Sequence, residues 1–274
     1  MGAGSCIGTA RGSVVGDEKL HLPGSESGGL AIDALTRPIT ILVGHFGSGK
    51  SEIAINLAFG LRNRGAEVTL VDLDLVKPYF RCRLAKEALE ARGIRLVAPQ
   101  GDRFYADLPI LVPEARSAAR DRAGPGTPLI FDVGGDDLGA RVLGSFSGLL
   151  DQTVTDLLFV VNANRPFAED LPSQVRMLGE VQGAVRLRVT GLVANTHLMQ
   201  QTTRETVLAG IRAAREVEAA TGIPLRFCAM LKEVARMVSG AEPILDNVPI
   251  LVMERHIVAP FAPRAWGRRR STVV

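Results

Sequence analysis

Cysteine and long apolar runs are scarce in this sequence of 274 residues. The 3 cysteines, Cys6, Cys82 and Cys228, lie far apart and form no Cys-x-x-Cys pair, which argues against a disulfide framework and against a cysteine-built zinc or iron–sulfur site. No apolar run approaches the roughly 18 residues that a membrane-spanning helix needs, and no basic start precedes an apolar stretch at the N-terminus. We therefore expect a cytoplasmic protein without a transmembrane segment.

Lysine is also rare, although the formal net charge is +3. The lysines are Lys19, Lys50, Lys77, Lys86 and Lys232, and arginine supplies the other basic side chains. So small an excess of positive charge does not call for a nucleic-acid partner, and we expect none. The scarcity also makes Lys50 noticeable, because it lies inside a glycine-rich loop.

Changes in composition divide the chain into three parts. Residues 1–36 are rich in Gly and Ser without a sustained apolar period, which predicts a flexible leader. Residues 37–258 alternate short apolar runs with longer amphipathic ones, and no linker interrupts them. Residues 259–274 contain two prolines and the run Arg268, Arg269, Arg270, which predicts a loosely ordered basic tail. We therefore expect one domain between two extensions.

The alternation within 37–258 predicts an α/β fold. Buried strands covered by helices, joined by right-handed crossovers, produce a doubly wound, mostly parallel sheet between two helical layers, in a three-layer α/β/α arrangement. The predicted strands are Ile39–Val43, Glu67–Val71, Ile94–Ala98, Pro128–Asp132, Leu157–Val161, Val189–Ala194, Pro224–Cys228 and Pro249–Met253. The predicted helices cover 50–64, 82–92, 113–122, 136–150, 170–183, 202–220 and 231–238.

A phosphate-binding loop follows the first predicted strand. Its residues satisfy Gly-x-x-x-x-Gly-Lys-Ser in full and precede a stretch of helical period; they are Gly44, His45, Phe46, Gly47, Ser48, Gly49, Lys50 and Ser51. Glycines let the backbone turn its N–H groups toward phosphate oxygens, and the following helix presents its positive end to the same anion. Lys50 would reach the β and γ phosphates of ATP, while the Ser51 hydroxyl would ligate Mg²⁺. This is the P-loop of a nucleotide-binding protein.

Carboxylates at the ends of two other strands complete the predicted site. The strand Pro128–Asp132 ends in Asp-x-x-Gly, which makes Asp132 a candidate partner of Mg²⁺ and Gly135 a backbone sensor of the γ phosphate. Asp72 and Asp74 end another strand, and as alternate residues they share one face of the extended chain. One of them can organise metal-bound water while the other orients the attacking water. We therefore place Asp72 with Ser51 and Asp132 on the metal.

These motifs resemble the MinD/ParA and cobyrinic-acid diamide synthase-like (CobQ/CobB-like) nucleotide-binding ATPases. The resemblance rests on the P-loop, on Asp72-Leu-Asp74 one helix later and on Asp132-Val-Gly-Gly135, and covers roughly 39–255. It implies that Asp74 is the hydrolytic aspartate, that Asp72 is its metal-side partner and that 75–83 form a nucleotide-sensitive switch. It also implies an adenine-reading role for Asn195, whose amide can both accept from and donate to a base edge.

The chain departs from this family at one position of the loop. Dimeric members carry a second lysine directly after the first loop glycine, where this chain has His45. The sequence therefore does not decide whether the protein forms a homodimer. Arg81 and Arg83 are candidates for the source of the missing positive charge.

Three classes of function remain compatible with this machinery. The first, which we favour, is a slow Mg²⁺-dependent ATPase whose nucleotide state controls binding to a client protein, in cell positioning or in enzyme or metallocentre maturation. The second is an ATP-dependent biosynthetic enzyme that activates a carboxylate, and the third is a small-molecule kinase. The sequence carries no signal for the identity of the client.

Overall fold

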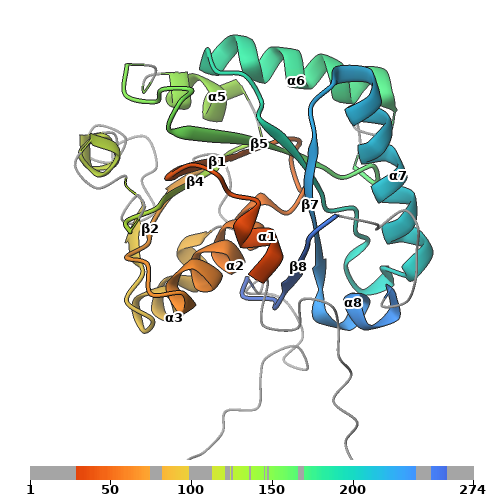
Figure 1. The fold of residues 1–274 in the computed structure, drawn as a ribbon, viewed down its shortest axis with the longest axis horizontal. Helices are drawn as coiled ribbons and strands as arrows, with labels where there is room; N and C mark the ends of the chain where they lie inside the picture. Colours follow the sequence, from red (N-terminus) through yellow and green to blue (C-terminus); the bar gives the residue numbers. More distant parts are fainter. Residues whose placement is uncertain are drawn as a thin grey trace, which may run out of the picture.

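One parallel sheet forms the body of the protein, as Figure 1 shows for the computed structural model. The structure describes residues 29–74, 82–98, 113–120, 124, 126–135, 137–144, 146, 148–165, 170–238 and 248–257. The 8-stranded sheet has the order β3-β2-β4-β1-β5-β6-β7-β8, and each neighbouring pair is parallel. The strands are β1 (Ile39–Val43), β2 (Thr69–Leu73), β3 (Arg95–Val97), β4 (Leu129–Val133), β5 (Thr155–Val161), β6 (Gly191–Ala194), β7 (Leu225–Leu231) and β8 (Ile250–Met253).

Helices cover both faces of this sheet (Figure 1). They are α1 (Gly29–Asp33), α2 (Lys50–Asn63), α3 (Lys86–Glu90), α5 (Asp137–Gly144), α6 (Leu171–Val185), α7 (Arg204–Thr221) and α8 (Lys232–Val238). A further helical stretch covers 113–120, and short 3₁₀ helices cover Cys82–Ala85 and Met199–Gln201. The predicted doubly wound α/β fold is confirmed, and each predicted strand is present with ends shifted by a few residues.

Alternate residues of the central strands serve two separate cores. In β1, the side chains of Ile39, Ile41 and Val43 pack in the core on the α5–α7 face of the sheet. Leu42 between them packs on the opposite face, in the core that also contains Ile53 of α2. The same alternation continues in β4 and β5, because successive side chains of a strand point to opposite faces. Strands buried on both faces need continuous apolar runs, which is what makes them recognisable in the sequence.

Local capping sets the ends of the long helices. The Asp170 side chain accepts a hydrogen bond from Ser173 N at 2.8 Å and begins α6. Thr203 and Thr206 form a reciprocal capping box at the start of α7, and Gly222 ends that helix at φ 71°. The helix α2 instead begins directly after the left-handed Gly49, so its first free N–H groups face the P-loop.

The first described helix corrects part of the predicted leader. We expected no stable structure in 1–36, yet Gly29–Asp33 is helical, with Ala31 and Ile32 buried against the core around α2. Thr36 then donates to the buried Asp156 through both its backbone N and its hydroxyl. Five helical residues are too few to show a period in the sequence, so tertiary contacts alone identify this element. The remainder of the leader and the basic tail lie outside the described residues.

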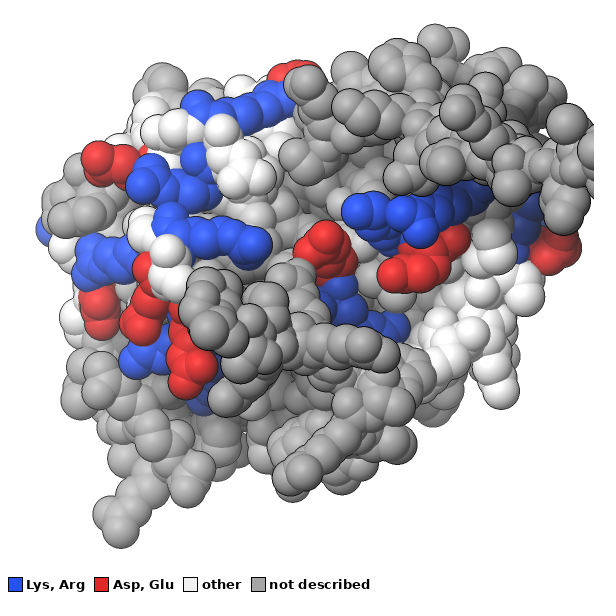
Figure 2. Space-filling view, turned by 90° about the horizontal axis from the view of Figure 1, so that it is seen from below, with Lys and Arg blue, Asp and Glu red and all other residues white. Residues whose placement is uncertain are grey.

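Charges of both signs are present on the surface. On the face in Figure 2, acidic side chains lie among the basic ones within the part that is drawn in colour. None of the helices in the described ranges has both the length and the apolar character required to cross a membrane.

Candidate functional site

The P-loop adopts a conformation that depends on its glycines. Gly44, Gly47 and Gly49 have φ values of 139°, 72° and 93°, which lie in a region that L-residues with a side chain rarely adopt. A Cβ on Gly44 would also stand 2.6 Å from the Val160 carbonyl oxygen of the neighbouring strand β5. The loop therefore packs closely against the sheet and returns at Gly49 into the N-terminus of α2.

Lys50 lies across the loop that precedes it. Its side chain is buried, and Nζ donates to the carbonyl oxygens of Gly44 at 3.0 Å and His45 at 2.9 Å. The ammonium is thus already held at the mouth of the loop, where phosphate oxygens can replace the two carbonyls as acceptors. His45 itself is half-buried, and burial together with the Lys50 charge lowers its pKa, so it is neutral near pH 7.

Two strands bring the predicted carboxylates together behind the loop. Asp72 of β2 and Asp132 of β4 are register partners on adjacent strands, and both are buried. The Ser51 hydroxyl hydrogen-bonds to the Asp132 carboxylate, and the Cys82 thiol donates to Asp132 Oδ2 at 3.2 Å. Burial, and secondarily the neighbouring Asp72 charge, raises the pKa of Asp132 to about 7.

These oxygen atoms fit a magnesium ion. Asp132 Oδ1 is buried without a hydrogen-bond partner, and a hydroxyl plus one or two carboxylates with substrate phosphates is the usual protein environment of Mg²⁺. Among the described residues no cluster of three or more His, Cys, Asp and Glu side chains could hold a metal ion by itself. A divalent cation would also neutralise the charge that burial disfavours on Asp132.

The apoprotein should lose stability as the pH rises toward 7, and Asp132→Asn should remove this loss. The folded-state pKa of about 7 lies above the ordinary value of 3.8, so this group's stabilising contribution is complete below pH 3.8 and is lost as the pH rises through about 7. At pH 8 in a chelator, Asp132→Asn should therefore gain on the order of 2 kcal/mol in unfolding free energy.

Thermal unfolding at pH 5.5 and pH 8 measures this effect. Asp151→Asn is the matched control, because Asp151 is exposed and its hydrogen bonds to Thr153 lower its pKa. An equal change in melting temperature for Asp132→Asn at the two pH values would contradict the prediction.

Arg83 lies beside the aspartates that end β2. Its Nε contacts Asp72 Oδ2 at 3.1 Å, and its Nη2 donates to the Asp74 carbonyl oxygen at 3.2 Å. The Asp74 backbone N–H in turn donates to Asp72 Oδ1 at 3.0 Å. Arg83 therefore serves as the counter-ion of Asp72, whereas Arg81 and 75–80 of the predicted switch lie outside the described residues.

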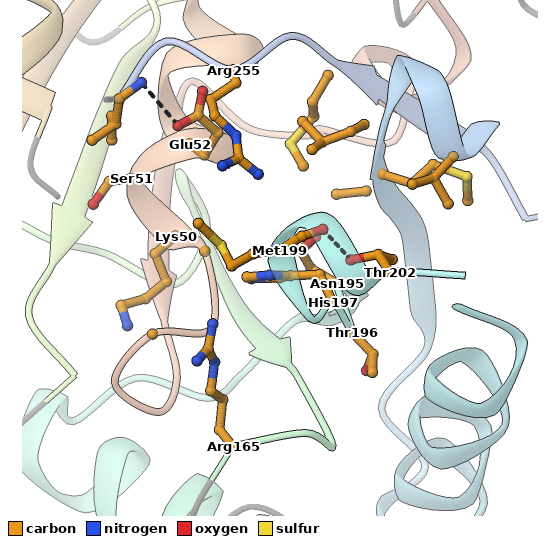
Figure 3. A pocket seen from close by; sticks show the side chains of 18 of the residues that line it. Lys50, Ser51, Glu52, Arg165, Asn195, Thr196, His197, Met199, Thr202 and Arg255 are labelled. Carbon is orange, nitrogen blue, oxygen red and sulfur yellow. Dashed lines mark hydrogen bonds between the residues drawn. The ribbon is translucent and has the colours of Figure 1, made fainter. Parts of the chain in front are cut away.

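A cavity of about 330 Å³ runs from the P-loop along the carboxyl ends of the strands. Open parallel sheets bind ligands at this edge, where the strand order reverses. The predicted site residues that line it are Phe46, Gly47, Gly49, Lys50, Ser51, Asp74, Gly135 and Asn195. Gly44, His45 and Ser48 of the loop do not line the cavity, nor do the buried Asp72 and Asp132. Figure 3 shows the side chains around this cavity.

Gly135 joins the Asp132 segment to the P-loop. A Cβ on Gly135 would stand 2.6 Å from Phe46 N and 2.8 Å from the Gly44 carbonyl oxygen. The close approach requires glycine and places the backbone of this segment directly against the phosphate loop.

The Asn195 side chain holds the P-loop through its hydrogen bond to the loop backbone at Ser48. Its Nδ2 donates to the Ser48 carbonyl oxygen at 2.7 Å, and a Cβ on Gly49 would collide with this amide. The Ser48 carbonyl oxygen can accept a hydrogen bond only from the amide nitrogen of Asn195, which fixes the orientation of the amide. The amide oxygen, Oδ1, is therefore the acceptor that the side chain still offers. Beyond Asn195 the cavity wall becomes apolar, with side chains from β7, α8 and β8; these include Ala229, Met230, Val234 and Met253.

The segment after β8 is fixed to α2 at this apolar end. The Glu52 carboxylate accepts hydrogen bonds from the backbone N–H groups of His256 and Ile257, while Asn56 pairs with the N–H and carbonyl of Glu254. Burial raises the pKa of Glu52 to about 7, even though these two N–H groups favour its ionised form.

The titratable lining residues that were absent from the predicted site are Glu52, Arg165, His197 and Arg255. Arg165 lies four residues beyond the end of β5, and this position after a buried strand is its signal in the sequence. Glu52 and Arg255 meet only through a contact between distant parts of the chain, which leaves no sequence signal. His197 lies two residues after Asn195, so its place on the cavity wall follows from the position of Asn195.

A glycine-dependent loop between β1 and α2, a lysine folded across it and buried carboxylates on adjacent strands define a P-loop nucleotide-binding protein. A family model described as the CobQ/CobB/MinD/ParA nucleotide binding domain matches residues 39–227. The chain therefore belongs to the CobQ/CobB/MinD/ParA family of nucleotide-binding proteins, as the motifs predict.

Comparison with individual proteins gives distant similarities. The cell division protein FtsY from Thermotoga maritima is 19% identical over 79% of this chain and 72% of its own, with a TM-score of 0.49. FtsY from Mycoplasma mycoides is 17% identical with the same TM-score, over 70% of this chain, and the match spans only 59% of that protein. A nucleotide-binding protein in complex with ADP from Archaeoglobus fulgidus is 17% identical over 82% of this chain and 96% of its own, with a TM-score of 0.45. No curated protein matches the sequence.

Proposed function

We propose that this protein binds ATP with Mg²⁺, hydrolyses it slowly and uses the nucleotide state to control binding to a client protein. The observation that carries this proposal is the cavity itself, which joins a P-loop containing Lys50 and Ser51 to an apolar wall of suitable size for a purine. Asp74 is the carboxylate at the phosphate end of this cavity within the described residues, and we assign it the role of orienting the attacking water.

The polar groups at the apolar end favour adenine over guanine. Guanine presents an N1–H and an amino group that pair best with a free carboxylate, whereas adenine presents an amino group that needs an acceptor. Of the carboxylates lining the cavity in the described residues, Glu52 already accepts two backbone N–H groups and Asp74 lies at the phosphate end. The Asn195 amide oxygen is an acceptor of the kind that the adenine amino group requires.

Two contacts support a switch over a metabolic enzyme. Gly135 packs on the P-loop backbone, and Arg83 connects Asp72 and Asp74 to the chain that follows β2. A γ phosphate at the loop would therefore lie close to Gly135 and to the Asp72–Arg83 pair, and switch proteins order such residues around the terminal phosphate. We place the client-binding surface around Gly135 and Arg83. The nucleotide would control this surface in the same way in a monomer and in a homodimer.

Binding and turnover assays with ATP and GTP test this proposal. We expect ATP to bind at least tenfold more tightly than GTP, and phosphate release to stay below about 0.1 per second without a client, since unassisted switch proteins hydrolyse slowly. Removing Mg²⁺ with a chelator should abolish turnover. Consumption of ATP without release of inorganic phosphate, in the presence of metabolites, would instead identify a small-molecule kinase or a carboxylate-activating enzyme.

A further inference from the structure

Arg165 points at the P-loop from the chain that follows β5 (Figure 3). Because β5 is hydrogen-bonded to β1, its carboxyl end lies next to the loop. A Cβ placed on Gly47 would stand 3.2 Å from Arg165 Nε and 3.3 Å from its Cζ. The guanidinium therefore lies against the middle of the loop, on the wall of the same cavity as Lys50.

This guanidinium has no anionic partner in the described structure. Arg165 Nε is buried without a hydrogen bond, and no ion pair among the described residues includes Arg165. Burial lowers its pKa, and no carboxylate offsets that effect. A buried donor without a partner destabilises a folded protein, so the presence of Arg165 Nε at a cavity indicates a ligand that supplies the missing acceptor.

The surrounding charges identify the ligand as an anion. Lys50 and Arg255 line the cavity together with Arg165, while His197 between them is kept neutral because burial, Arg165 and Arg255 lower its pKa to about 4. Glu52 and Asp74 also line the cavity, so three basic side chains face two carboxylates there, and neither carboxylate forms an ion pair with Arg165 in the described structure. A planar guanidinium offers paired N–H donors that match two oxygens of a phosphate.

We propose that Arg165 binds the phosphate chain of the nucleotide from within the same protein molecule, as a second cation beside Lys50. The inference rests on the proposed ATP-binding function and adds a residue to it. It also supplies positive charge to a loop in which His45 is neutral, without a partner subunit.

Arg165→Ala tests this assignment through affinities for MgATP, MgADP and adenosine. The dissociation constants of both nucleotides should rise about 10- to 50-fold, the range for one charge-assisted contact, while that of adenosine should change less than twofold. The slope of log Kd against log salt should become shallower for ATP, because one charge contact is lost. Arg165→Lys, which keeps the charge, should recover part of the affinity. Arg176→Ala, which removes a hydrogen-bonded exposed arginine of α6, is the matched control.

The stability of the apoprotein separates binding from packing. Because Arg165 Nε lacks a partner, Arg165→Ala should leave the melting temperature of the nucleotide-free protein unchanged or higher. A lower melting temperature together with weaker adenosine binding would overturn the proposal in favour of a packing role. Wild-type ATP affinity in Arg165→Ala would overturn it while leaving the proposed function intact. Failure of the wild type to bind ATP would instead remove the proposed function and, with it, this assignment.

Discussion

Lys50→Ala should weaken ATP binding and lower turnover at least about 100-fold, because it removes the ammonium that spans the P-loop. In the nucleotide-free protein, Nζ donates to the Gly44 and His45 carbonyl oxygens. Those two acceptors are fixed by the left-handed glycine conformations of the loop, so the ammonium is already positioned before the phosphates arrive. The loss of Lys50 leaves these two carbonyl dipoles facing the phosphate oxygens without the ammonium between them, so this part of the site becomes repulsive to the phosphates.

Isothermal titration with MgATP and a phosphate-release assay measure this loss. Lys86→Ala is the matched control, since it deletes the same side chain from an exposed ion pair with Glu90 on α3. We expect the control to bind ATP within twofold of the wild type. An ATP affinity for Lys50→Ala within threefold of the wild type would show that the loop does not hold the phosphates.

The fold could be predicted because its strands are buried on both faces. Runs such as Ile39–Val43 and Leu129–Val133 contribute to both cores at once, so each is apolar at all but one position and stands out from the amphipathic helices. Strand order was not needed to recognise the fold class, since right-handed crossovers constrain the topology. The five residues of α1 could not be predicted, because their burial depends on contacts with α2, β7 and β8 rather than on a local period.

The phosphate end of the site could be predicted for a different reason. Its parts are short motifs at strand ends, and parallel strands deliver such residues to one edge, as the register of Asp72 with Asp132 illustrates. The opposite end depends on contacts between segments about 200 residues apart, such as Glu52 with His256 and Ile257. Neither partner has a recognisable motif, and their meeting is decided by the position of β8 at the sheet edge. Arg165 falls between these two ends of the site. Its position after a strand can be predicted from the sequence, whereas its lack of a counter-ion among the described residues is a property of the folded structure.

Asp74→Asn should lower the rate of ATP hydrolysis by about 100- to 10,000-fold, the usual contribution of a group that takes up or orients a proton. Asp74 lies directly after β2 and lines the cavity beside the P-loop. Its backbone is held on both sides, by Asp72 Oδ1 at the N–H and by Arg83 Nη2 at the carbonyl oxygen. The side chain is therefore carried by a fixed backbone, and an asparagine of the same shape should keep its position while losing the negative charge that attracts a proton from water.

Binding and turnover should separate in this variant, which distinguishes it from Lys50→Ala. ATP affinity should stay within about threefold of the wild type or improve, because removing a carboxylate beside the phosphate chain reduces like-charge repulsion. Equilibrium titration and single-turnover hydrolysis on the same preparation measure the two quantities, with Asp151→Asn as the exposed control. Normal hydrolysis by Asp74→Asn would transfer the orienting role to Asp72 or Asp132, the neighbouring carboxylates beneath the loop. In that case the variants Asp72→Asn and Asp132→Asn decide which of these two carboxylates orients the water. The two have different partners, since Asp72 has Arg83 as its counter-ion and Asp132 contacts the Ser51 hydroxyl.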